Sequence, residues 1–270
     1  PLLYRKQRLA IFNNSRYAII EGATKSGKTV ACLSWIIEQA VNGSAGKNYW
    51  WIAPVYPQAK IAYRRLKRAM TRRIYIANEA ELTITMRNGA IIGFKSAEKP
   101  DNLYGEDVYG AVLDEATRMR EESWHAIRAT LTATSGKVRI IGNVKGRRNW
   151  AYRLSRQAEA GIIDWHYAKL TAWDAVDAGI VSKAEIEDAR NILPDSVFKE
   201  LYLAEPSDDG GNPFGISSIE SCITNMSKEK AVYWGIDLAK SQDYTVIIGL
   251  DMGGKVCYFD RFQQSWESTE

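Results

Sequence analysis

The feature that most constrains the fold of this chain is a short glycine-rich segment, residues 22–29, with the sequence GATKSGKT. It satisfies every fixed position of the phosphate-binding loop pattern G-x-x-x-x-G-K-[ST]. Such a loop turns successive backbone N–H groups toward phosphate oxygens, and the helix that follows it adds a partial positive charge. The segment therefore predicts a binding site for a nucleoside triphosphate.

The flanking residues favour the order of strand, loop and helix that this chemistry requires. Residues 17–20 form a short apolar run rich in strand formers, and residues 30–37 have the composition of a largely buried helix. The alternative is a flexible turn that happens to carry Gly and Lys. In the binding interpretation, Lys28 reaches the β- and γ-phosphates and the Thr29 hydroxyl binds Mg²⁺. The other loop residues predicted to contact the nucleotide are Gly22, Thr24, Lys25, Ser26 and Gly27.

Composition excludes several classes of site. The length of 270 residues allows one large α/β domain and part of a second, and a net charge of +4 is compatible with a polyanionic partner. The three cysteines form no C-x-x-C pair and the two histidines lack metal-ligand spacing, so neither a zinc site nor a disulfide framework is predicted. No apolar run reaches the roughly 20 residues of a membrane span and no signal peptide is evident, so we expect a soluble cytosolic protein.

A second acidic signal follows the apolar run at residues 108–113, which ends in Asp114 and Glu115. In a phosphate-loop enzyme, a strand beside the loop presents one carboxylate to Mg²⁺, and a neighbouring acid polarises the attacking water. Asp114 suits the first role and Glu115 the second. An Asp-Glu pair at a strand end is common by itself, but together with the phosphate loop it predicts an ATPase site.

A predicted helix at residues 58–73 carries the densest run of basic side chains in the chain. Apolar residues recur along one face of this helix, and its arginines and lysines fall mostly elsewhere. A solvated face and a surface that contacts phosphates explain this pattern equally well.

The remaining patterns outline an α/β fold. Strands are predicted at residues 48–53 and 138–142, and an Asn-Gly turn between residues 82–86 and 90–94 predicts a hairpin. Residues 150–205 have a mainly helical pattern with polar interruptions.

These motifs resemble those of the large subunits of tailed-phage terminases, the motors that pump DNA into capsids. The resemblance covers nearly the whole sequence. Residues 95–105, which lead into LDEA, are similar to the family's approach to its second ATPase motif. Residues 141–150, IGNVKGRRNW, resemble its coupling motif, and residues 198–205 resemble the exit from its lid subdomain.

The resemblance implies a P-loop NTPase domain at residues 1–206, with an additional-strand, RecA-like core and a helical lid at about residues 150–206. It assigns Gln7 to adenine contact and Asn143 to sensing of the γ-phosphate, so that Lys28, Glu115 and Asn143 form the expected catalytic set. The alternatives are that Gln7 is an ordinary helix residue and that Asn143 is a turn residue at a strand end.

Two positions depart from the family pattern. Many terminases carry an arginine where this chain has Tyr104, and that arginine can act in trans on the nucleotide of a neighbouring subunit. Many also carry an arginine inside the phosphate loop where Thr24 stands, although Lys25 beside it offers a charge. Alternative arginines for the trans role are Arg118, Arg120, Arg147 and Arg148.

Beyond a predicted linker at residues 207–215, residues 216–270 resemble the opening of an RNase H-like α/β nuclease domain. Asp237 stands in the place of the first metal-binding acid, and Asp243 also matches the family pattern. Cleavage with two Mg²⁺ or Mn²⁺ ions needs further carboxylates, which the family supplies later in the chain, so we expect negligible cutting here. The expected elements are strands at 232–239 and 245–250 and a hairpin turn at 251–254.

The leading hypothesis is an ATP-hydrolysing motor that translocates double-stranded DNA into a viral procapsid. The resemblance implies DNA, a portal protein and a small terminase subunit as partners, a homo-oligomeric ring on the capsid, and no membrane. It places the protein in the host cytoplasm and transiently at the portal vertex. One alternative is a helicase-like ATPase that remodels nucleic acid, which predicts a second motor domain. Another is a non-hydrolysing, nucleotide-gated DNA-binding adaptor, against which Glu115 argues.

Overall fold

The computed structural model describes residues 2–206, 216–238 and 244–263. By its internal contacts the chain divides into two units, Pro1–Pro213 and Phe214–Glu270, and each has a sheet of its own. Within the described part of the chain, no helix has the length and hydrophobicity needed to span a membrane.

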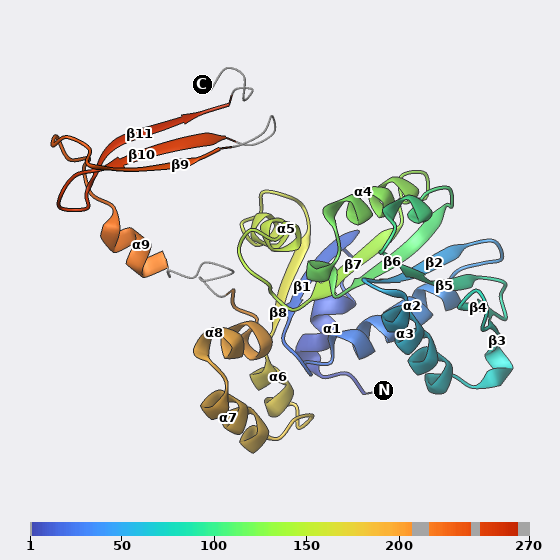
Figure 1. Ribbon diagram of the computed structural model, residues 1–270. Helices are drawn as coiled ribbons and strands as arrows, with labels where there is room; N and C mark the ends of the chain where they lie inside the picture. Colours follow the sequence, from blue (N-terminus) through green and yellow to red (C-terminus); the bar gives the residue numbers. More distant parts are fainter. Residues whose placement is uncertain (1, 207–215, 239–243, 264–270) are drawn as a thin grey trace. The chain divides into compact units, whose positions relative to one another are not determined.

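The first unit is built on an eight-stranded sheet with the order β3-β4-β5-β2-β6-β7-β1-β8 (Figure 1). In this spatial order, all neighbours from β5 through β2, β6, β7 and β1 to β8 pair in parallel. β3 and β4 add an antiparallel edge beside β5. β7 lies between β1 and β6, as expected of an additional-strand core. The strands are β1 (Tyr17–Gly22), β2 (Asn48–Ala53), β3 (Tyr75–Asn78), β4 (Thr83–Met86), β5 (Ile91–Ser96), β6 (Val108–Asp114), β7 (Lys137–Gly142) and β8 (His166–Leu170).

Helices cover both faces of this sheet, because side chains of buried strands alternate between two apolar layers. Ala18 and Ile20 of β1 join the core under α1 to α3, whereas Tyr17 and Ile19 join the core under α4 and α5. The helices concerned are α1 (Arg5–Ile11), α2 (Lys28–Val41), α3 (Tyr56–Ala69), α4 (Glu121–Thr130) and α5 (Trp150–Glu159), with short 3₁₀ turns η1 (Arg72–Ile74), η2 (Pro100–Leu103) and η3 (Ala116–Arg118).

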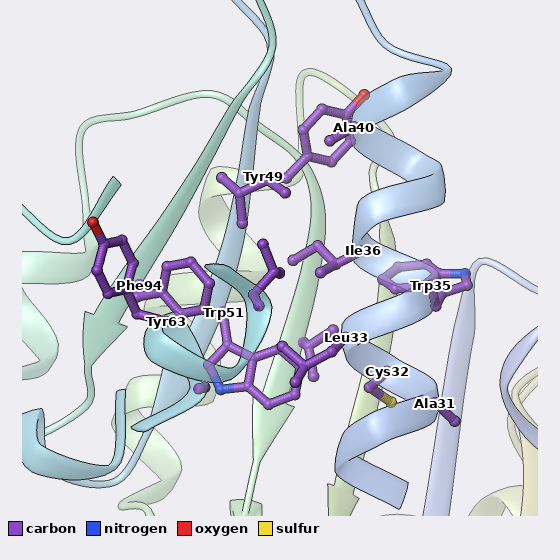
Figure 2. Packing of buried hydrophobic residues seen from close by; sticks show 14 of the residues in the cluster. Ala31, Cys32, Leu33, Trp35, Ile36, Ala40, Tyr49, Trp51, Tyr63 and Phe94 are labelled. Carbon is purple, nitrogen blue, oxygen red and sulfur yellow. The ribbon is translucent and has the colours of Figure 1, made fainter. Parts of the chain in front are cut away.

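Large side chains fix α2 against the sheet. Figure 2 shows Leu33 and Ile36 of α2 directed toward Trp51 and Tyr49 of β2. Trp51 is fully buried, and the burial of such a large apolar side chain makes a major contribution to stability. The first turn of α2, which carries the end of the phosphate loop, is therefore held in place by a dense core.

A small helical group follows the sheet and contains α6 (Ala172–Asp177), α7 (Lys183–Ile192), α8 (Asp195–Phe198) and the π-helix η4 (Lys199–Leu203). It has its own apolar cluster, in which Ile186 and Phe198 are buried together with Ala23 of the phosphate loop. We call this group, residues 172–203, the helical lid. It is shorter than the predicted lid at about residues 150–206, because α5 packs on the large sheet and β8 pairs with β1, and its action as a lid stays a prediction.

Several predicted elements are confirmed, and two edge strands were missed. The strands predicted at residues 17–20, 48–53, 108–113 and 138–142 all form, and so does the hairpin with the Asn-Gly turn. The segment predicted as mainly helical contains β8, which pairs with β1. β8 and β3 are edge strands with mixed burial, so their sequences lack the apolar runs that mark central strands.

The second unit contains α9 (Ile216–Cys222) and an antiparallel sheet of β9 (Tyr233–Asp237), β10 (Thr245–Leu250) and β11 (Val256–Phe262), with β10 in the middle. The predicted hairpin turn is confirmed, since the Asp251 carboxylate accepts hydrogen bonds at 2.9 Å from the N–H groups of Gly253 and Lys255. The predicted linker at residues 207–215 lies outside the described residues.

Candidate nucleotide site

The predicted phosphate loop connects β1 to α2 and depends on two glycines. A Cβ atom at Gly22 would lie 2.6 Å from Cδ of Lys28, so a larger residue would displace the lysine that folds back over the loop. Gly27 has a φ of 81° and precedes the first turn of α2, and a Cβ atom there would lie 2.5 Å from Nε2 of Gln7. The packing around the loop therefore favours glycine at both positions, and the left-handed backbone is a further reason at Gly27.

Three predicted catalytic residues meet at the carboxyl edge of the sheet. The buried Lys28 ammonium donates a hydrogen bond to Oδ1 of Asn143 at 2.7 Å and lies 3.4 Å from Oε1 of Glu115. It also donates to the carbonyl oxygen of Ala23 at 3.3 Å. These side chains come from α2, from the segment after β7 and from the end of β6, which the parallel sheet brings to one edge.

Asp114, at the end of β6, is suited to bind a cation. Burial raises the pKa of its carboxyl group to about 7, and the neighbouring Glu115 adds to this rise, while Lys28 and Arg65 oppose it. Its Oδ1 atom is buried without a hydrogen-bond partner. An unpartnered carboxylate oxygen in a polar site fits a hard divalent cation, which prefers oxygen ligands.

Magnesium would find only part of its coordination shell on the protein. The described residues contain no group of three or more His, Cys, Asp or Glu side chains that could hold a metal alone. Mg²⁺ is commonly held by one or two protein oxygens together with substrate phosphates and water. Asp114 and the hydroxyl of Thr29, in the first turn of α2, fit this pattern.

Glu115 has a left-handed backbone conformation, with φ 54° and ψ 45°. This conformation costs energy for a residue with a Cβ atom, and such strain is often concentrated at functional sites. It ends β6 abruptly, so the Glu115 side chain faces the loop lysine while the chain turns into η3.

The phosphate loop is in direct contact with the helical lid. The backbone N–H of Thr24 donates to the carbonyl oxygen of Leu201 at 2.7 Å, and Nδ2 of Asn143 lies 3.5 Å from the same oxygen. The N–H of Gly146 donates to the Glu200 carboxylate at 3.2 Å. The predicted nucleotide contact of Thr24 is therefore occupied by the lid in this structure.

The other predicted loop residues differ in accessibility. Lys25 is exposed and has a φ of 58°, and Ser26 is buried with its hydroxyl bonded to the Ala23 carbonyl at 2.8 Å. Their contacts with a nucleotide stay predictions.

Gln7 is buried against the loop. Its Nε2 donates to the Gly27 carbonyl at 2.6 Å, and its Oε1 accepts from the backbone N–H of Tyr4. The Tyr4 hydroxyl donates to the carbonyl of Ser26 at 2.8 Å, a contact that sequence reasoning missed. Helix α1 thus holds the loop through two carbonyl groups, and the adenine contact of Gln7 stays a prediction.

Sequence reasoning also missed Glu21, which is buried immediately before the loop. Its carboxylate accepts hydrogen bonds from the hydroxyls of Ser155 and Tyr167, at 2.5 and 2.6 Å, and forms an ion pair with Arg156. The network fastens the end of β1 to α5 and β8. A charged residue at the end of an otherwise apolar strand was the available signal, because a buried charge needs partners.

The candidates for a trans-acting group lie at the surface. Tyr104, which replaces the arginine of many terminases, is 53% exposed beside η2. The alternative arginines all have exposed side chains on the segments that follow Glu115 and Asn143, and they are Arg118, Arg120, Arg147 and Arg148.

The predicted basic helix forms as α3 but ends at Ala69, before the last arginines of the run. Arg64, Arg68 and Arg72 are exposed around an open hollow, which Lys67 and Glu79 also line. Lys67 is paired with Glu79. The surface therefore retains a local excess of positive charge.

The predicted nuclease acids are not assembled into a site in the described part of the second unit. Asp237 is exposed at the end of β9, and the described residues offer no cluster of three potential metal ligands around it. Asp243 lies outside the described residues.

Comparison with known proteins points in the same direction as this geometry. The family model described as "Terminase large subunit, T4likevirus-type, N-terminal" matches residues 19–221. The large terminase subunit of Thermus virus P23-45 is 24% identical over an alignment that covers 78% of this chain and 53% of that protein. The chain thus spans about half the length of the curated relatives it matches.

Solved structures share the fold. The alignment with the HK97 bacteriophage large terminase has a TM-score of 0.68 at 18% identity. It covers 97% of this chain and 63% of the HK97 chain. The ATPase domain of the Thermus phage P74-26 large terminase has a TM-score of 0.59 at 24% identity and covers 76% of this chain and 94% of that domain. With the family model matching most of its length, this chain belongs to the terminase large subunit family.

Proposed function

We propose that this chain is the ATP-hydrolysing part of a viral motor that translocates double-stranded DNA into a procapsid. The observation that carries the proposal is the convergence of Lys28, Glu115 and Asn143 at the end of the phosphate loop. Family membership supports it, and so do structures of the large terminase of a thermophilic bacteriophage solved with ADP and with ATP-gamma-S.

In this proposal each side chain has a chemical role. Lys28 exchanges its bond with Asn143 for the β- and γ-phosphate oxygens of ATP. Asp114 and Thr29 hold Mg²⁺, which supplies positive charge to the phosphates. Glu115 orients a water molecule and accepts its proton as the water attacks the γ-phosphorus, and ADP leaves with the bond to the γ-phosphate broken.

Asn143 lies in a position to couple this chemistry to movement. Its side chain contacts Lys28 on one side and the Leu201 carbonyl of the lid on the other. When phosphate replaces Asn143 as the partner of Lys28, the amide is released, and the contact between loop and lid changes with the state of the γ-phosphate. The lid can then adopt two positions relative to the loop, and the bound nucleotide shifts the equilibrium between them.

The proposed partners follow from the family. The exposed arginines of α3 suit the phosphate backbone of DNA, and we place a portal protein, a small terminase subunit and further copies of the chain in the same assembly. Its site of action would be the portal vertex in the host cytoplasm. Endonuclease activity, with Asp237 binding Mg²⁺ or Mn²⁺, is assigned only to a chain that supplies the remaining acids.

The test is steady-state ATP hydrolysis over a range of protein concentrations, with and without double-stranded DNA. We expect turnover that rises more than linearly with concentration, is stimulated by DNA and falls at least about a hundredfold in Glu115→Gln, while nucleotide binding persists. Glu122→Gln, an exposed acid in the first turn of α4, is the matched control and keeps wild-type turnover. Equal turnover in Glu115→Gln and the wild type would refute the assignment.

A further inference from the structure

We propose that Thr117 is a positioning residue of this site, which holds Asn143 where its amide meets Lys28. Thr117 lies in η3, two residues after Glu115. Its hydroxyl donates a hydrogen bond to the backbone carbonyl of Asn143 at 2.9 Å. The kinetic consequence of this bond rests on the proposed ATPase function, whereas its structural consequence does not.

The segment that carries Asn143 depends on such anchors. Residues 143–149 form neither helix nor strand, so no ladder of backbone bonds fixes them. Besides the Thr117 hydroxyl, Nδ2 of Asn149 donates to the Thr117 carbonyl at 2.8 Å, and the Trp150 indole N–H donates to the Met119 carbonyl at 2.9 Å. Both ends of the segment are therefore fastened to the turn that follows Glu115.

This arrangement makes the η3 turn a common support for two catalytic groups. Glu115 enters the turn with a left-handed backbone, and Thr117 is the side chain of the turn that reaches across to Asn143. One hydrogen bond thus joins the turn that Glu115 enters to the backbone of Asn143, whose side-chain amide meets Lys28. Removing it frees the Asn143 side chain to leave Lys28 and the Leu201 carbonyl, while the side chains of Lys28 and Glu115 are unaltered.

Thr117→Val keeps the shape of the side chain and removes the donor, and Thr117→Ser keeps the donor. We expect Thr117→Val to lower kcat about tenfold, the effect of one net hydrogen bond, with little change in KM for ATP. Thr117→Ser should restore kcat to near the wild-type value. Thr130→Val, which removes a buried hydroxyl that donates to the Ile127 carbonyl within α4, is the matched control and should leave kcat unchanged.

A double variant tests whether Thr117 acts through Asn143. Once Asn143→Ala has removed the amide, adding Thr117→Val should cause no further loss of kcat. Multiplicative losses, or wild-type kcat in Thr117→Val alone, would overturn the proposal.

A measurement on the nucleotide-free chain separates this inference from the proposed function. The side-chain amide NMR signal of Asn143, assigned by its disappearance in Asn143→Asp, should shift in Thr117→Val and stay in place in Thr117→Ser and Thr130→Val. If the wild-type chain showed no turnover, that shift would still establish the positioning role while the ATPase proposal failed. An unchanged signal in Thr117→Val would overturn the inference whatever the turnover.

Discussion

Strands β6 and β9 have the same sequence pattern and different surroundings. Each is a short apolar strand that ends in an aspartate, Asp114 in the first unit and Asp237 in the second. In β6, five of seven residues are buried, whereas all five residues of β9 are exposed. Asp114 lies beside Glu115 and Lys28, and one of its carboxylate oxygens is buried without a hydrogen-bond partner, whereas Asp237 lies on an exposed strand.

The difference suggests what turns an apolar strand with a terminal acid into a site: neighbouring strands must bring other polar side chains to the same edge of the sheet. β6 is an interior strand between β2 and β7, so its carboxyl end meets the phosphate loop and the segment of Asn143. Among the described residues, β9 pairs only with β10 and lies at one side of a three-stranded sheet. Burial at the end of β6 also raises the pKa of Asp114.

The largest expected effect is on stability and compares one tryptophan from each sheet. Trp51 of β2 is fully buried and Trp234 of β9 is 57% exposed. Trp51→Ala should lower the free energy of unfolding by about 3–5 kcal/mol through lost burial and a cavity. Trp234→Ala should cost under about 1 kcal/mol, since it is largely in water and loses mainly its contact with the Tyr258 ring. Urea denaturation followed by circular dichroism measures both, and similar losses would mean that β9 is covered in solution.

The next effect concerns the two aspartates themselves. Asp114→Asn should reduce ATP turnover by at least about a hundredfold, because an amide is a poor ligand for Mg²⁺. Asp237→Asn, the matched substitution at the end of β9, should leave turnover unchanged. The dependence of turnover on Mg²⁺ concentration is the second readout, and only Asp114→Asn should raise the concentration required. A wild-type Mg²⁺ dependence in Asp114→Asn would remove this residue from the metal site.

Those features of the site that depend on side-chain type and spacing could be predicted from sequence. The loop, its strand and its helix follow from the fixed positions around Lys28, and the pair of acids follows from the end of an apolar run. The distance of 3.4 Å between Glu115 and Lys28 could not be predicted without the strand order, because β7 lies between β6, which precedes Glu115, and β1, which precedes the loop. The position of Asn143 was predicted by family resemblance alone.

Contacts made by backbone groups could not be predicted, because every residue has a carbonyl oxygen. The Leu201 carbonyl that accepts from Thr24, and the Gly27 carbonyl that accepts from Gln7, have no signature in the sequence. The edge strand β8 was missed for a related reason, since it is stabilised by pairing with β1 rather than by an apolar run of its own. Packing and pairing partners, not local preference, decide these features.

The smallest expected effect tests a contact that joins distant elements of the first unit. The Lys6 ammonium donates to both oxygens of Asp174 at 2.7 Å and so links α1, which holds the phosphate loop, to α6 of the lid. Burial raises the pKa of Asp174, but hydrogen bonds from Lys6 and Thr171 outweigh it and leave that pKa below its usual value. In the second unit, a hydrogen bond with Ser227, in the segment before β9, and backbone hydrogen bonds from Lys255 and Gly253 in its own hairpin lower the pKa of Asp251.

Because the folded pKa of Asp174 is lowered, its stabilising effect is present above the unfolded pKa of about 3.9 and is lost as pH falls through the folded value. Lys6→Met should therefore cost less than about 1 kcal/mol near neutral pH, since the pair is partly exposed and screened by solvent. The difference from wild type should shrink as the pH of urea denaturation is lowered, and Arg5→Met, on the same helix, should show no such trend. A deficit that persists in acid would show that the ion pair with Asp174 is not the source of the stabilisation, because Met keeps an apolar stem at this position.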